Sequence, residues 1–166
     1  MLVSGCDDRS IDETWDALRA AVGTDLGASE PQTIDQAMVD THAATTGDAQ
    51  WIHNDPERAR REGPFGGPVV QGFLLLSLLT RHGAALRIPE AGSVTMLVNY
   101  GFDRVRFVAP VPVGATVRVR GRLADVRPKG PDRAVVVLDV VMEARSGEAE
   151  PVDALIATWC FLAVRG

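Results

Sequence analysis

The sequence is poor in cysteine, in clustered positive charge and in long apolar runs, and each shortage excludes a class of protein. It has two cysteines in 166 residues, Cys6 and Cys160, which lie near opposite ends without a disulfide framework or metal-ligand spacing. Its 17 lysines and arginines are scattered and the formal net charge is −5, so no nucleic-acid or anionic-membrane surface is indicated. No apolar run approaches the ~20 residues that span a bilayer. We therefore expect a soluble protein of the reducing cytoplasm, without nucleic-acid, membrane or metal partners.

The length of 166 residues is enough for one domain with a sizeable core and short for two. We expect a single domain over residues 1–166, in which residues 1–30 form an N-terminal extension. A short amphipathic helix is predicted within this extension from Glu13 to Val22, through Trp15 and Leu18.

Three further helices are predicted in the first half of the chain. Thr33 and Gln36 have the spacing of a capping box, which predicts a helix from there to about Thr45. Asp55 before Pro56 is typical of an N-cap followed by proline at the first helical position. Residues 69–86 form the third helix, which is apolar on every face in its first half and is therefore expected inside a core.

The second half of the chain is typical of strands. Strand-like runs cover residues 94–108, 115–126, 134–144 and 152–164, with turn signals between them, and in the second run apolar and polar residues alternate. Arg118, Arg120 and Arg122 are expected on a solvated face. The sequence predicts an α+β fold in which an antiparallel sheet curls around the helix at residues 69–86.

The chemistry of the chain is concentrated before that helix. Asp48 and His53 lie five residues apart on a predicted loop over residues 47–54, and a turn rich in glycine and proline follows at residues 63–68. An aspartate and a histidine can move protons to and from a bound water, and backbone N–H groups at a helix start can stabilise an oxyanion. This combination indicates addition or removal of water next to a carbonyl. His42 is expected in the core, and His82 near the surface.

Several separated blocks resemble the MaoC-like dehydratase family of hotdog folds, in its NodN-like, (R)-specific enoyl-CoA hydratase branch. The resemblance covers about residues 34–163. Its strongest parts are residues 46–48, 51–59, 63–67, 74–79, 99–101, 105–107 and 110–114, in the family's order.

The resemblance implies a long helix wrapped by an antiparallel sheet, and a homodimer. It implies hydration of trans-2-enoyl-CoA to (3R)-3-hydroxyacyl-CoA and the reverse dehydration, with coenzyme A as part of the substrate and no separate cofactor. Asp48 and His53 match the catalytic pair, and the backbone N–H of Gly72 matches the oxyanion donor. Two positions depart from the family: Gln71 stands where histidine is usual, and His42 where an aromatic residue is usual.

Further substrate contacts are weaker expectations. Gln71 and Asn99 are expected either to line the acyl pocket or to satisfy backbone groups, and Thr80 lies two turns after Gly72. Arg104 and Arg106 are expected either to form a polar sheet face or to bind the phosphates of coenzyme A.

Two other functions stay open on the same fold, because a fold alone does not determine chemistry. One is hydrolysis of an acyl-CoA thioester, and the other is binding of an acyl thioester without turnover. The length of the acyl chain and the carrier, coenzyme A or acyl carrier protein, are also left open by the sequence.

Overall fold

The computed structural model of the protein describes residues 9–89 and 94–166, with side chains from Trp15 onward. The helices are α1 Arg9–Ala20, α2 Gln36–Thr46, α3 Trp51–Asn54, α4 Pro56–Glu62 and α5 Gly72–Gly83. The strands are β1 Asp25–Ala28, β2 Gln32–Thr33, β3 Val94–Phe107, β4 Thr116–Pro128, β5 Arg133–Arg145 and β6 Val152–Arg165. The expectations for residues 1–8, including Cys6, lie outside the described residues.

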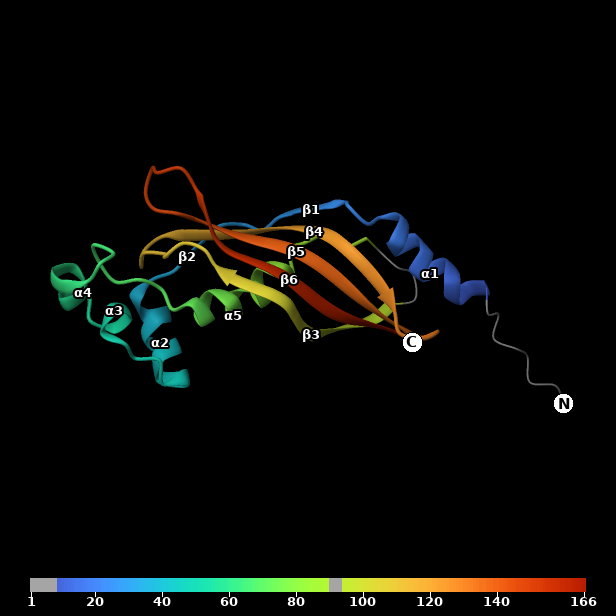
Figure 1. Ribbon diagram of the computed structural model, residues 1–166, viewed down its shortest axis with the longest axis horizontal. Helices are drawn as coiled ribbons and strands as arrows, with labels where there is room; N and C mark the ends of the chain where they lie inside the picture. Colours follow the sequence, from blue (N-terminus) through green and yellow to red (C-terminus); the bar gives the residue numbers. More distant parts are fainter. Residues whose placement is uncertain (1–8, 90–93) are drawn as a thin grey trace.

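The strands form one antiparallel sheet in the order β1-β4-β5-β6-β3, and β2 also pairs with β4. Its four long strands curve around α5, as Figure 1 shows, while α2, α3 and α4 gather at one end of the molecule. The α+β arrangement predicted from the sequence is confirmed. The shorter strands β1 and β2, and the helix α3, were not predicted.

The core lies between α5 and the concave face of the sheet. Leu74, Leu75 and Leu79 of α5 are buried in one cluster with the inward residues of the strands. In β4 the alternation predicted from the sequence is confirmed, because Val117, Val119 and Leu123 are fully buried. The three intervening arginines are exposed and form ion pairs, Arg118 and Arg120 with Glu143 and Arg122 with Asp139.

One face of α5 is open, which the sequence analysis did not expect. Phe73 is 66% exposed, and Ser77 and Thr80 on the same side of the helix are exposed as well. An apolar helix was expected to be enclosed on all sides, but the sheet covers only part of it. The open face therefore presents an apolar residue, Phe73, next to Phe107 of β3 at a ring-centroid distance of 6.1 Å.

The helix ends partly differ from their sequence predictions. The N-cap of α2 is Asp35, whose Oδ1 accepts a hydrogen bond from Met38 N–H at 2.9 Å, so the predicted capping box at Thr33 is wrong. Thr33 instead pairs with Thr116 in the sheet. Asp55 does cap α4, accepting from Arg58 N–H at 3.0 Å, with Pro56 at the start of the helix. The helix predicted to end at Val22 ends at Ala20.

His82 is buried, and the expectation of a surface position is wrong. It lies in the last turn of α5, is 3% exposed, and its Nδ1 shares a hydrogen bond of 2.8 Å with Ser29 Oγ. Ser29 Oγ in turn accepts from Val119 N–H at 2.9 Å, and Nε2 of His82 has no partner within the described residues. Burial, with a smaller contribution from Arg81, lowers the pKa of His82 below its usual value.

No helix among the described residues is long and apolar enough to cross a membrane.

Candidate active site

Asp48 follows the end of α2 directly. Gly47 takes the left-handed conformation that ends many helices, with φ 80°, and its N–H donates to Ala43 O. Asp48 N–H then lies 3.3 Å from Thr46 Oγ1, which accepts its hydrogen bond. The Asp48 carboxylate is half-buried and has no hydrogen bond among the described residues. It is therefore free to contact a bound molecule.

His53 lies in α3, the short helix in the predicted loop, and is 8% exposed. Its Nδ1 is 2.6 Å from Val69 O. Because a carbonyl oxygen can only accept, Nδ1 carries the proton of the neutral ring, which leaves the lone pair on Nε2. Nε2 has no hydrogen bond and is not among the fully buried unpartnered atoms. This nitrogen is thus oriented to accept a proton.

The main chain around His53 is held from two sides. Gln36 Nε2 of α2 donates to His53 O at 2.9 Å and also to Asp40 Oδ1. On the other side, Val69 N–H donates to Ile52 O at 3.0 Å. Gln36 and Val69 therefore position His53, a role that the sequence pattern predicts for neither residue. The spacing of Gln36 from Thr33 predicts a capping box instead.

Gly72 is the first residue of α5, and its N–H has no acceptor within the described residues. The first N–H groups of a helix lack partners and lie at the positive end of its dipole, so they suit an oxygen that gains negative charge. A Cβ at this position would lie 3.2 Å from three atoms of the Phe107 ring. Because glycine has no Cβ, β3 can pass close to the start of the helix.

Residues 69–72 connect Asp48, His53 and Gly72. Val69 O binds the His53 ring, and Gln71 Nε2 reaches the main-chain oxygen of Asp48 at 3.4 Å. Gly72 follows directly. The structure therefore brings Asp48, His53 and Gly72 to the start of α5, from segments up to 24 positions apart in the sequence.

The other predicted contacts are not gathered there. Thr80 is exposed two turns along α5. Asn99 Oδ1 accepts from Trp159 Nε1 at 2.9 Å, and Trp159 packs against Gly83 at the far end of the helix. Val105 packs against the core, so Arg104 and Arg106 on either side of it face the opposite side of the sheet.

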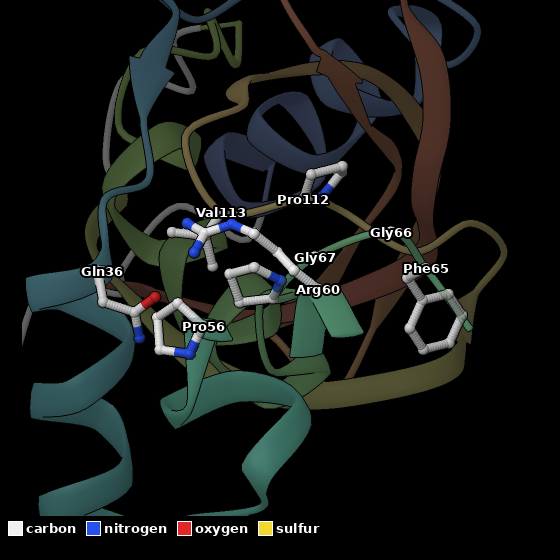
Figure 2. A pocket seen from close by; sticks show the side chains of 9 residues that line it. Gln36, Pro56, Arg60, Phe65, Gly66, Gly67, Pro112 and Val113 are labelled. Atoms are coloured by element: carbon white, nitrogen blue, oxygen red, sulfur yellow. The ribbon is translucent and has the colours of Figure 1, made fainter. Parts of the chain in front are cut away.

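A pocket of about 390 Å³ lies beside the glycine-rich turn. It is lined by Gln36, Pro56, Arg60, Phe65, Gly66, Gly67, Pro68, Pro112 and Val113. Figure 2 shows the Arg60 side chain extending across it toward Gln36. Through Gln36, this pocket shares a wall with the segment that carries His53.

Comparisons with known proteins identify the family of the chain. Residues 18–144 match the model of the MaoC like domain. The chain belongs to the MaoC-like dehydratase family. Nodulation protein N of Rhizobium meliloti is 43% identical over 142 residues, which are 86% of this chain and 86% of that protein. The 3-hydroxyacyl-thioester dehydratase Z of Mycobacterium tuberculosis is 41% identical over 134 residues, 81% of this chain and 86% of that protein.

Solved structures support the family's fold. A structure described as a monoamine oxidase regulatory protein of Archaeoglobus superposes with a TM-score of 0.71 at 25% identity, covering 87% of this chain and 91% of that one. The (R)-hydratase of A. caviae superposes with a TM-score of 0.64 at 24% identity, over 84% and 94% of the two chains. The expected hotdog fold and the expected class of enzyme, a hydratase or dehydratase of the MaoC-like family, are confirmed.

Proposed function

We propose that this MaoC-like protein adds water to trans-2-enoyl-CoA thioesters to form (3R)-3-hydroxyacyl-CoA, and catalyses the reverse dehydration. The observation that carries the proposal is the His53 ring, whose Nδ1–H is held by Val69 O two residues before Gln71. With Nδ1 held in this way, Nε2 of His53 is available to accept a proton, and Gln71 connects the Asp48 main chain to the residue before Gly72. The relatives support the choice of a thioester, since one of them is named a 3-hydroxyacyl-thioester dehydratase.

Each group has a distinct role in the proposed reaction. The Asp48 carboxylate orients a water toward C3 and shares in its deprotonation, while His53 Nε2 accepts a proton from that water. The hydroxyl bonds to C3, and His53 returns the proton to C2. Between these events the thioester oxygen carries negative charge, which the Gly72 N–H stabilises. Water is consumed and no electrons are transferred, so the proposed reaction needs no redox cofactor.

Hydration of a short trans-2-enoyl-CoA tests the proposal, because the conjugated absorbance disappears as water adds. We expect the wild-type protein to bleach it and to form the (3R) product. Asp48→Asn and His53→Ala should each lower kcat by about 100- to 10,000-fold. The control is Asp16→Asn, at an exposed residue whose carboxylate pairs with Arg19 and with no other side chain that the structure describes. Near-normal turnover in either site variant rules out this mechanism.

Two further measurements separate the two alternative functions. Release of free thiol from a saturated acyl-CoA would indicate a thioesterase. Saturable binding of enoyl-CoA without turnover at any chain length would indicate a binding protein. Comparing enoyl-CoA with enoyl-acyl carrier protein determines the carrier, and a series of chain lengths determines the depth of the acyl pocket.

We also propose that the enzyme is a homodimer joined along β3, acting in the cytoplasm. β3 is a 14-residue edge strand that pairs with β6 among the described residues. It exposes Met96, Leu97, Val98 and Tyr100, beside the open face of α5. A long, apolar edge strand is a template for pairing with another chain, and a second copy offers the same surface under twofold symmetry. Light scattering should give twice the chain mass, and a monomer at all concentrations would contradict this.

A further inference from the structure

Gln71 is a buried amide whose orientation is determined by its neighbours. It is fully buried, and its Nε2 lies 3.1 Å from Val39 O in α2 and 3.4 Å from Asp48 O. Both neighbours are carbonyl oxygens, which only accept, so the NH₂ group must face them. Oε1 points elsewhere and has no partner among the described residues. The two donated hydrogen bonds are therefore what this side chain contributes.

These hydrogen bonds connect three elements at the start of α5. The main chain of Gln71 is the N-cap of α5, although its side chain does not cap the helix. The side chain instead crosses to α2 and to the segment after it. Residues of the asparagine and serine type, which would cap the helix, are too short to make this crossing.

The other hydrogen bonds of the segment that carries Asp48 hold it to its neighbours in the sequence. Gln50 O accepts from His53 N–H at 2.9 Å and from Asn54 N–H at 3.2 Å, both in α3. Asp48 N–H contacts Thr46 Oγ1 at 3.3 Å, and Ala49 N–H donates to Gly47 O at 2.9 Å, both within the same segment. In the described part of the chain, residues 48–50 make no other hydrogen bond to α5 or to its N-cap. Gln71 thus sets the position of Asp48 relative to Gly72.

We propose that Gln71 is a positioning residue, which holds the Asp48 carboxylate at the correct distance from the Gly72 N–H. This inference rests on the proposed hydratase function for its kinetic consequence. One residue places both groups, because its main chain precedes Gly72 and its side chain binds the carbonyl of Asp48. The attacking water and the thioester oxygen lie at opposite ends of the reacting enoyl group. The Asp48 carboxylate and the Gly72 N–H, which bind them, must therefore keep a constant separation. Misplacement by about 1 Å can cost on the order of 100-fold in rate.

The test compares two substitutions at Gln71 with one matched control. Gln71→Met preserves the length and volume of the side chain and removes both donors. Gln71→Glu preserves the length and has an O–H donor only while the carboxyl is protonated, and burial against carbonyl oxygens raises its pKa. Gln32→Met is the control, since the half-buried Gln32 also contacts α2, through Met38 Sδ, but away from the site.

We expect Gln71→Met to lower kcat by about 10- to 100-fold with KM within about twofold of wild type. Gln71→Glu should retain more activity at acidic pH and lose it as the pH rises and the carboxyl ionises, whereas Gln32→Met should follow the wild-type profile. Wild-type kcat in Gln71→Met, or a Gln71→Glu profile that superposes on that of wild type, overturns the proposal.

Amide hydrogen exchange tests the contact without turnover, which separates this inference from the proposed function. Residues 47–50 should exchange faster in Gln71→Met than in wild type or Gln32→Met, while the strands are unchanged. Equal exchange in all three proteins overturns the positioning role even if the enzyme is active. If the wild-type protein is inactive as a hydratase but residues 47–50 still exchange faster in Gln71→Met, the contact is supported and only the proposed hydratase function is refuted.

Discussion

At the scale of residues, the sequence predicts Asp48 and His53 from their short spacing, and the family resemblance adds Gly72. The structure connects these three residues through residues 69–72. The residues that hold them were not predictable, because their contacts join distant segments. Gln36 binds His53 O, and Val69 O binds the ring, only after α2 and the segment before α5 have packed around α3.

His82 shows the same limit, and it leads to a prediction about pH. A histidine next to an arginine near a helix end is typical of a surface position, yet Ser29 and the sheet enclose it. Its lowered pKa means that the folded protein binds this proton less readily than the unfolded chain, whose histidine titrates at about 6.5. Stability is therefore unaffected well above that value and decreases as the pH falls below it.

We expect the melting temperature of wild type to fall more between about pH 7.5 and pH 5.5 than that of His82→Gln. The glutamine does not titrate and can still bond Ser29. His42 and His53 are present in both proteins, so the difference between the two melting curves reports His82. Equal pH dependence in the two proteins would show that His82 is not the responsible group.

At the scale of elements, the long strands were predictable and the short pieces were not. Long strand-like runs bounded by turn residues are a strong signal, and all four long strands lie within two residues of their predicted ends. The strands β1 and β2 have four and two residues, and α3 has four, which is too short for any periodicity. They form because β4 and α2 provide surfaces to pair with or pack against.

The contact between the end of α5 and β6 gives a prediction at this scale. A Cβ at Gly83 would lie 2.7 Å from the ring of Trp159. That ring stacks on Phe102, contacts Phe161 and donates to Asn99, so it cannot easily move. Gly83→Ala should therefore destabilise the protein by about 1–3 kcal/mol, even though alanine favours helix by up to about 1 kcal/mol.

Thermal unfolding measures this effect, as a fall of about 2–4 °C for each kcal/mol in a chain of this size. Gly67→Ala is the matched control, because its nearest atom would be Arg60 Cγ at 3.9 Å, an ordinary contact. A melting temperature for Gly83→Ala equal to that of the control would mean that the Trp159 ring can move to accommodate the added methyl group.

For the whole molecule, the sequence predicted a helix inside a sheet but not the surface that remains uncovered. Composition gives the apolar content of α5 and β3, and topology decides which part faces solvent. β3 ends the sheet, and α5 has one side without strands. The apolar residues there are explained if a second copy covers them, in line with the proposed homodimer.

Leu97→Lys tests that explanation. Leu97 is an exposed, apolar residue in the first third of β3, and lysine on an edge strand opposes pairing with another chain because its charge would be buried. We expect the mass from light scattering to shift toward one chain, and the melting temperature to lose its dependence on protein concentration. Val152→Lys is the control, since Val152 is a similarly exposed residue in β6, outside β3. If both variants keep the wild-type mass, β3 is not the interface, and the open face of α5 must be covered in another way.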